Sequence, residues 1–98
     1  MAEFLVEVYR SRVHAETPAA EQAQRARDAA EELSREGITV RYLSSIFLPA
    51  DETCFYLYEA PSADAVRMVA LRADLPSARI VEAMTDLFAK AVPVLPLR

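Results

Sequence analysis

The chain has 98 residues, of which 53% are hydrophobic and only one is glycine, so it is long enough for one domain with a single core. Its 15 acidic residues against 11 lysines and arginines give a net charge of −4, and the arginines are scattered among acids, which argues against nucleic acid as a partner. The apolar runs are shorter than the roughly 18 residues of a membrane-spanning helix, and the single cysteine cannot form an intrachain disulfide, which fits a reducing cytoplasm.

An alternating pattern at residues 3 to 11 predicts the first β-strand, because its apolar residues recur with a period of two. Thr17 and Pro18 then predict the start of a helix: threonine can cap free amides, and proline suits the first helical position. Gly37 supplies the end of this helix. Its narrow apolar face consists of Ala23, Ala26, Ala30 and Leu33. The charged residues of its other face are interpreted as a solvated, salt-bridged surface.

The middle of the chain predicts a β-hairpin from Ile38 to Ala60, with a turn at residues 49–52. Ser62 is expected to cap a second helix, and Leu75–Pro76 to end it. A fourth strand is predicted over residues 78–86. The buried stripe of the second helix is expected to consist of Ala65, Val66, Val69, Ala70 and Ala73.

The order β-α-β-β-α-β is that of a ferredoxin-like α+β domain, here predicted over residues 1–86. Such a domain has a four-stranded antiparallel sheet with both helices on one face. The apolar tail, residues 87–98, contains prolines that exclude a central strand. We expect this tail to pack on the edge of the sheet or on a partner subunit.

The two faces of the predicted sheet can be assigned from the register of the hairpin. Pairing Leu48 with Thr53 would place Phe47 opposite Cys54, Ser45 opposite Tyr56 and Leu43 opposite Tyr58. The aliphatic side of the first strand, Phe4, Val6 and Val8, suits the helices. The open face is then expected to carry Leu5, Glu7, Tyr9, Leu43, Phe47, Cys54, Tyr56 and Tyr58. A patch this apolar is rare on a monomer, so we predict a homodimer or higher homo-oligomer in which two sheets pack face to face, as in dimeric α+β barrels.

Several segments of the chain are similar to one known family: Phe4–Glu7, Tyr42–Phe47, Asp51–Cys54, Tyr58–Ser62, Leu75–Pro76 and Arg79–Ala83. They resemble the DUF4242 family of small uncharacterised domains, which includes a nickel-binding protein. The resemblance extends to about Met84. It implies a ferredoxin-like, dimeric fold and, for at least one member, a role for a metal.

The resemblance makes nickel or another transition metal a candidate cofactor. Nickel favours imidazole and accepts thiolate, but this chain has one histidine, His14, and one thiol, Cys54. Metal-binding members of the family are expected to carry histidine near residues 43–45 or 67–71, and this chain has none there. Two subunits could still assemble a site together.

The candidate ligand-binding residues are Glu7, Tyr9, Cys54, Tyr56 and Tyr58. A carboxylate at Glu7 would be desolvated in a dimer interface, which would raise its pKa and suit it to proton transfer; the alternative is an ion pair with Arg41 or Arg79. The tyrosines could aim hydroxyls into one cavity, or simply pack in an interface. Cys54 is interpreted as a nucleophile or as a small buried hydrophobe.

Three functions follow from these patterns. The first, which the family resemblance implies, is a small dimeric, non-enzymatic protein that binds a metal ion or a small molecule. The second is a cofactor-free enzyme of the dimeric α+β barrel type, an isomerase, cyclase or monooxygenase acting on an apolar substrate. In that enzyme Glu7 would abstract a proton while tyrosines stabilise negative charge. The third is a structural module whose open face only makes the dimer.

Overall fold

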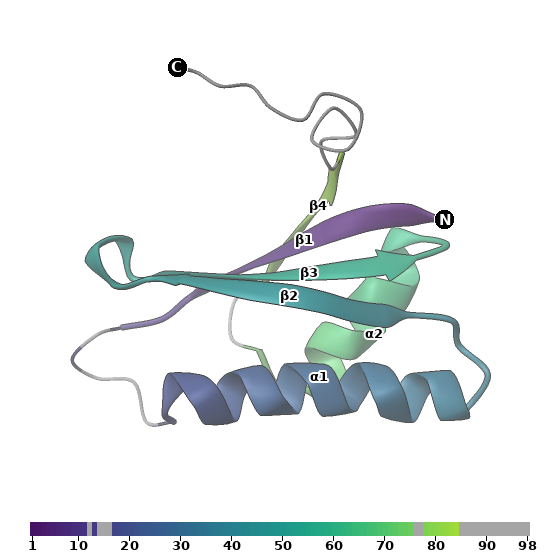
Figure 1. The fold of residues 1–98 in the computed structure, drawn as a ribbon, viewed down its shortest axis with the longest axis horizontal. Coiled ribbons are helices and arrows are strands. Elements are labelled where there is room, and N and C mark those ends of the chain that lie inside the picture. Colours follow the sequence, from purple (N-terminus) through teal and green to yellow (C-terminus); the bar gives the residue numbers. More distant parts are fainter. Residues whose placement is uncertain (12, 14–16, 76–77, 85–98) are drawn as a thin grey trace, which may run out of the picture.

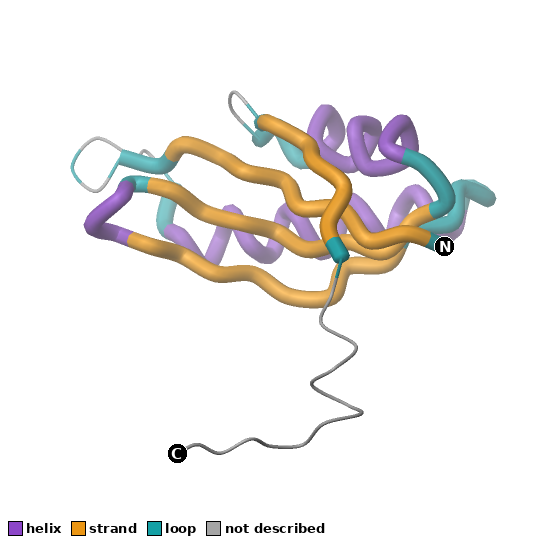
Figure 2. Tube along the Cα trace, turned by 90° about the horizontal axis from the view of Figure 1, so that it is seen from above, coloured by secondary structure: helices purple, strands orange, loops and turns teal. Residues whose placement is uncertain are grey.

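The computed structural model describes residues 1–11, 13, 17–75 and 78–84. The strands are β1 (Ala2–Tyr9), β2 (Arg41–Leu48), β3 (Thr53–Ala60) and β4 (Arg79–Ala83); the helices are α1 (Ala19–Arg35) and α2 (Ala63–Arg72). The sheet has the order β2-β3-β1-β4, with every pair of neighbours antiparallel. Both helices lie on the same side of this sheet (Figures 1 and 2). The predicted ferredoxin-like β-α-β-β-α-β fold is confirmed.

The strand boundaries differ slightly from the sequence-based expectation. β1 ends at Tyr9 rather than at residue 11, and β2 begins at Arg41 rather than at Ile38. β4 ends at Ala83, within the predicted range of 78–86. The end of that range and the predicted tail, residues 87–98, lie outside the described residues.

The first helix starts without a side-chain cap, so the expected capping role of Thr17 is wrong. Pro18, predicted at the first helical position, instead occupies the N-cap position, so the helix begins one residue later than predicted. The backbone carbonyl of Thr17 instead accepts a hydrogen bond from the Arg10 guanidinium, which draws this residue toward the end of β1. The predicted end of the helix is confirmed. Gly37 has φ of 96°, a conformation that glycine adopts without steric cost.

The two helices end in the same way. After α1, the amide of Gly37 donates to the carbonyl of Ser34 (3.1 Å) and that of Ile38 donates to Leu33 (2.9 Å). After α2, the amide of Leu75 donates to the carbonyl of Ala70 (3.0 Å). This is the Schellman arrangement, which satisfies carbonyls that the helix leaves unpaired.

The second helix follows its predicted pattern at its start and along its buried face. The Ser62 hydroxyl accepts a hydrogen bond from the amide of Ala65 (3.4 Å), which confirms the predicted cap. All five residues of the predicted stripe are buried. The helix ends before the predicted break at Leu75–Pro76, of which Pro76 lies outside the described residues.

The core lies between the helices and one face of the sheet. The strands contribute Phe4, Val6, Val8, Cys54, Tyr56, Tyr58 and Ala60. The helices contribute mainly alanines, together with Leu33, Val66 and Val69. Because alanine adds little bulk, the backbone of α1 lies close enough to the sheet for the tyrosines of β3 to reach polar groups on it.

The predicted hairpin register is confirmed at Leu48 with Thr53, Phe47 with Cys54, and Ser45 with Tyr56. The predicted pairing of Leu43 with Tyr58 is wrong. An irregularity between Tyr42 and Ser44 shifts the register by one residue, so that Tyr42 lies opposite Tyr58. An extra residue of this kind is a β-bulge, which a turn-based register cannot anticipate.

The predicted orientation of the hairpin is also wrong. In the pairing of β1 with β3, Phe4 lies opposite Tyr58, Val6 opposite Tyr56, and Val8 opposite Cys54. Residues directly opposite each other point to the same face, so these three residues of β3 face the helices. Phe47 also packs against the core rather than on the open face. The hairpin register alone decides which residues share a face; only the partner strand decides which face it is.

Candidate functional site: the open sheet face and a groove beside it

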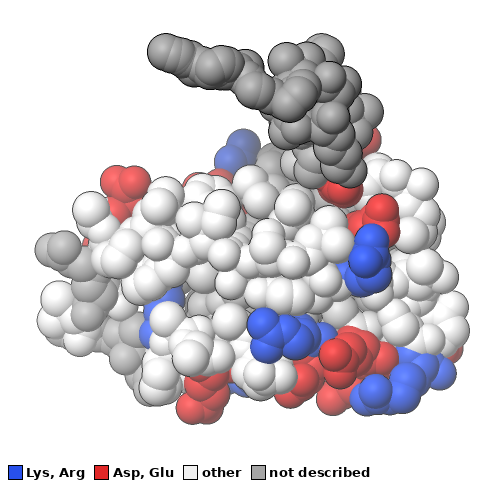
Figure 3. All heavy atoms as spheres, in the orientation of Figure 1, with Lys and Arg blue, Asp and Glu red and all other residues white. Residues whose placement is uncertain are grey.

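The face opposite the helices carries a continuous set of apolar side chains. Its central row crosses the sheet through Ser44, Leu57, Leu5 and Val81, which are neighbours in adjacent strands. The next row crosses through Ile46, Phe55, Glu7 and Arg79. Ile46 is 56% exposed and Leu48 is 39% exposed, whereas the leucines of the central row are partly buried by their neighbours. Figure 3, which views the sheet from its β2 edge, shows few charged side chains along the strands and many along α1 below them.

Two ion pairs join neighbouring strands on this face. Arg79 Nη1 lies 2.9 Å from Glu7 Oε1, and Arg41 Nη2 lies 2.9 Å from Glu59 Oε1. Glu7 therefore has one of the two partners expected from the sequence, while the other, Arg41, pairs with Glu59. The side chains of Glu7 and Arg79 are 35% and 70% exposed, so solvent screens their attraction.

One carboxylate oxygen on this face is unsatisfied. Glu3 lies between Glu59 and Ala83 in the row at the end of the sheet. Its Oε1 atom is enclosed and has no hydrogen-bond partner in the part of the chain that the structure describes. Buried carboxylate oxygens normally accept a hydrogen bond, so this position lacks a donor.

The five predicted ligand-binding residues do not come together in one subunit. Glu7 lies on the open face, and Tyr9, at the end of β1, is 58% exposed. Cys54, Tyr56 and Tyr58 lie on the other face, beneath α1, and are at most 4% exposed. The sheet thus separates the predicted carboxylate from the predicted tyrosines of β3. His14 lies outside the described residues.

The buried tyrosines have their hydroxyls already engaged. Tyr56 donates to Gln22 Oε1 (2.7 Å), and Tyr58 donates to the backbone carbonyl of Ala26 (2.8 Å). Burial raises the pKa of both hydroxyls and also that of the Cys54 thiol. A neutral thiol in the core is a poor nucleophile and a poor metal ligand.

Arg10 and Gln22 are buried polar residues that the sequence analysis did not single out. The Arg10 guanidinium lies 5.6 Å from the centre of the Phe47 ring and donates to the carbonyl of Thr17. A signal for Arg10 was available, because its even number places it in line with Val6 and Val8. Gln22 likewise precedes Ala26 by one helical turn, on the same stripe.

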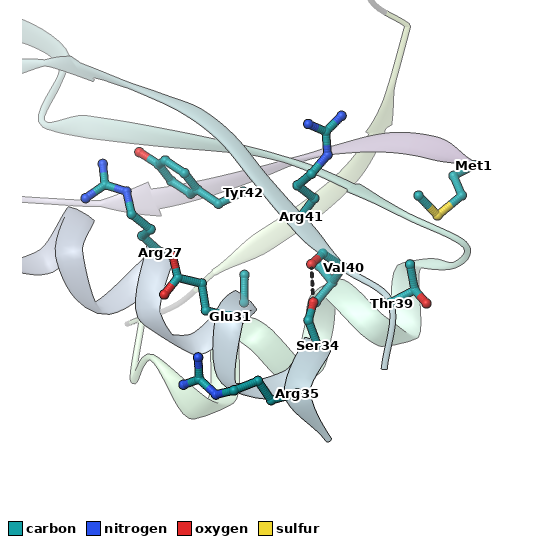
Figure 4. Close-up of a pocket in the computed structure, with 10 residues that line it drawn as sticks. Met1, Arg27, Glu31, Ser34, Arg35, Thr39, Val40, Arg41 and Tyr42 are labelled. Atoms are coloured by element: carbon teal, nitrogen blue, oxygen red, sulfur yellow. Dashed lines mark hydrogen bonds between the residues drawn. The ribbon is translucent and has the colours of Figure 1, made fainter. Parts of the chain in front are cut away.

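A groove of about 560 Å³ lies between α1 and β2 (Figure 4). Its walls include the three arginines Arg27, Arg35 and Arg41, together with Glu31 and Tyr42. The Arg27 guanidinium stands 4.9 Å from the centre of the Tyr42 ring, within range of a cation–π contact. The sequence-based interpretation of this helix face as a plain solvated surface therefore missed a concave site.

The described residues do not bring together the donors that nickel prefers. They contain no group of three or more histidine, cysteine, aspartate or glutamate side chains placed to hold a metal ion. The thiol of Cys54 is enclosed in the core. In addition, no helix in the described ranges is long and apolar enough to cross a membrane.

Comparisons with known proteins assign the family. No curated protein matches this chain in sequence. A crystal structure of SCO4226 from Streptomyces coelicolor A3(2) matches with 28% sequence identity and a TM-score of 0.61, covering 87% of this chain and 99% of that one. Residues 8–83 match the family described as nickel responsive protein SCO4226-like. The match confirms the predicted family resemblance, and the chain belongs to the family described as nickel responsive protein SCO4226-like.

Proposed function

We propose that this protein is a homodimeric, non-catalytic binding protein whose two subunits pack their open sheet faces together. The observation that carries this proposal is the continuous apolar surface formed by Leu5, Ile46, Phe55, Leu57 and Val81. Both helices pack on the opposite face, so the chain's own described elements leave this surface uncovered. Large apolar patches on small domains mark interaction sites.

A second copy of the chain is the partner that this face fits. A two-fold axis would bring identical faces together, so the central row of Leu57, Leu5 and Val81 would meet its own copy. The packing of two sheets buries inner-face residues in this manner.

Assembly would change the surroundings of the Glu7–Arg79 pair. The pair lies beside Phe55, so a facing sheet would exclude water from it and strengthen its electrostatic attraction. We assign to Glu7, with Tyr9 at the end of the same strand, the contacts to a small polar ligand at the interface. Cys54, Tyr56 and Tyr58 would act on that site only by supporting the sheet from beneath.

The family description points to nickel, but the described residues of one subunit do not fit it. Nickel in proteins is held by imidazole, thiolate and carboxylate groups that converge on one point. The absence of such a group within the described residues leaves His14 and a second subunit as the remaining sources of ligands. No metal-dependent step is therefore derived for this chain.

Binding fits the geometry better than catalysis does. The enzyme considered above needs Glu7 and the tyrosine hydroxyls in one cavity. The structure places Tyr56 and Tyr58 on the other side of the sheet, where their hydroxyls donate to groups of α1. Stabilising a developing negative charge requires donors that are free to reach it.

Sedimentation velocity at micromolar concentration tests the proposed dimer. We expect the wild-type protein to sediment as a dimer and the Leu57→Asp variant as a folded monomer, because a charge in the central row would be buried without a partner. Leu71→Asp is the matched control, since Leu71 is 77% exposed on α2 and away from the interface. This control should remain dimeric.

Two outcomes would overturn the proposal. One is a wild-type protein that sediments as a monomer throughout the micromolar range. The other is equal dissociation by Leu57→Asp and by Leu71→Asp. Circular dichroism checks that the variants fold. If Leu57→Asp unfolds, Ile46→Asp replaces it, because Ile46 is 56% exposed and tolerates a charge in the monomer.

A further inference from the structure

The groove between α1 and β2 concentrates positive charge in an acidic protein. The whole chain carries a net charge of −4, yet three arginines and a single acidic residue, Glu31, line this groove. A concave site lined by one sign of charge focuses the electrostatic potential and raises the local concentration of ions of the opposite sign. This contrast between groove and chain points to an anionic ligand.

The arginines of the groove differ in how firmly they are held. Arg41 already donates two hydrogen bonds to Glu59, and Arg27 donates to Gln24 while it covers the Tyr42 ring. The side chain of Arg35 makes no hydrogen bond or ion pair with any described residue, although its charge helps to lower the pKa of the neighbouring Glu36, which pairs with Arg72. The Arg35 guanidinium therefore keeps all its donors for a ligand, and Arg27 keeps part of its own.

Glu31 reduces the positive charge of this groove without cancelling it. It follows Arg27 and precedes Arg35 by four residues each, so it lies between them along α1. In Figure 4 the Arg27 side chain extends toward Tyr42, whereas that of Arg35 extends away from it. Despite this spacing, Glu31 forms no ion pair with either arginine within the described part of the chain. Its charge lowers the positive potential of the groove, but both guanidinium groups remain available.

Apart from the hydroxyl residues Ser34 and Thr39, the rest of the lining is mainly apolar. Ala30, Val40 and Tyr42 contribute to the walls, next to the arginines. Ligand sites typically combine such walls with a few charged groups, in volumes of about 300 to 1,000 Å³. The groove, at about 560 Å³, has room for an aromatic molecule of one or two rings.

We infer that this groove binds a small organic anion, in which a carboxylate contacts Arg35 and an aromatic or other apolar body lies against Val40 and Tyr42. Guanidinium groups favour carboxylates because their paired donors match the two oxygens. The inference rests on α1 and β2 within one subunit and does not require the proposed dimer.

Titration with 2-naphthoate, followed by nuclear magnetic resonance of the ¹⁵N-labelled full chain, tests this inference. We expect saturable shifts at the amides of Thr39, Val40 and Tyr42. The uncharged 2-naphthamide should bind at least about tenfold more weakly, because it loses the charge-assisted hydrogen bonds. Inorganic phosphate, which lacks the apolar body, should also bind more weakly than 2-naphthoate.

Variants identify the groups that bind. Arg35→Ala should weaken 2-naphthoate binding about tenfold, and Glu31→Gln should strengthen it several-fold by removing the opposing charge. The matched control is Arg67→Ala, which removes an exposed arginine of α2 and should leave the affinity unchanged. Both groove residues are exposed, so these substitutions are expected to leave the fold intact.

Three results would overturn the inference. The first is the absence of saturable shifts at these amides. The second is equal affinity for 2-naphthoate and 2-naphthamide, which would indicate apolar contact without recognition of charge. The third is an equal loss of affinity in Arg35→Ala and Arg67→Ala. Sedimentation of the same samples separates this test from that of the dimer, because the two properties can fail independently.

Discussion

The two faces of the sheet are made by the same strands, yet the helices of the chain cover only one of these faces. On the helix side, Val6, Tyr56 and Tyr58 are fully buried, and both tyrosine hydroxyls donate to groups on α1. On the open side, Leu5, Phe55 and Leu57 alternate with these residues and are only partly covered. The difference shows that the apolar residues of a strand do not by themselves reveal whether they are buried by the chain's own helices or left for another partner.

The two faces also differ in the kind of polar groups that they carry. Tyr56, Tyr58 and Gln22, under α1, are neutral and paired over short distances within the core, and the buried guanidinium of Arg10 at the end of this face donates to the carbonyl of Thr17. Those on the open face are charged and form ion pairs between neighbouring strands, at Glu7–Arg79 and Arg41–Glu59. Charged pairs keep a wet face soluble in a free subunit, whereas neutral donors suit a dry core.

Truncating adjacent residues of β3 should reveal the largest difference in stability between the two faces. Tyr58→Ala should lower the free energy of unfolding by roughly 3 to 5 kcal/mol, the range for removing a large buried aromatic side chain. Leu57→Ala should cost less than about 1 kcal/mol in the dissociated subunit, because this side chain lacks a packed partner there. Urea denaturation at low protein concentration measures both. Equal losses would contradict the asymmetry between the faces.

Removing single tyrosine hydroxyls, one from each face, should give the next largest difference in stability. Tyr56→Phe would leave the buried Oε1 of Gln22 without its donor, at a cost of about 1 to 3 kcal/mol. Tyr9→Phe is the control, since Tyr9 is 58% exposed and water replaces any lost contact. Its unfolding free energy should stay within about 0.5 kcal/mol of the wild type. A comparable loss in the two variants would be evidence against a structural role for the Tyr56 hydroxyl.

Alkaline pH should destabilise the helix-covered face. Burial raises the pKa of Cys54, whereas the thiol of the unfolded chain ionises near pH 8.5, about its ordinary value. Below that pH both states keep the proton, and the full stability is present. Above it the unfolded state loses the proton first, so the free energy of unfolding falls by up to about 1.4 kcal/mol per pH unit.

The tyrosines extend this loss above about pH 10, because burial raises the pKa of Tyr56 and Tyr58 as well. Urea midpoints measured between pH 7 and pH 10.5 check the prediction. Cys54→Ala should flatten the dependence in the lower part of this range, and Tyr58→Phe in the upper part. A wild-type stability that stays constant to pH 10.5 would contradict it.

The smallest effect is expected on the open face. Glu7→Gln removes a charge from a half-exposed ion pair and keeps an acceptor for Arg79, so the unfolding free energy of the subunit should change by less than about 0.5 kcal/mol. Circular dichroism should show an intact fold, and binding of the proposed interface ligand should weaken. Unfolding of this variant would instead assign Glu7 a structural role.

Much of the fold was predictable because it depends on local chemistry. The alternation along residues 4–9, the αL position at Gly37 and the cap at Ser62 each act within a few residues of chain. The register of the hairpin between Leu48 and Thr53 was predictable for the same reason. The bulge near Leu43 was not, since no turn residue marks it.

The candidate site was less predictable than the fold. Glu7 and its partner Arg79 were anticipated, because opposite charges on the same face of neighbouring strands can form an ion pair. The groove at α1 and β2 was missed, because helical spacing places Arg27 and Arg35 on the exposed part of α1 but does not show that a strand lies beside them. A concave surface arises only when two elements meet.

By itself, the sequence determined the order of the elements and which residues of β1 and of β3 share a side, because period-two alternation, caps and turns are local properties. Only the tertiary structure decided that Cys54, Tyr56 and Tyr58 lie beneath α1 while Phe55 and Leu57 face outward. Both sides of β3 are apolar enough to be buried, so which side packs against the helices depends on how β3 pairs with β1, a strand distant in the chain. That pairing places each tyrosine next to a polar group of α1, a match that neither strand encodes alone.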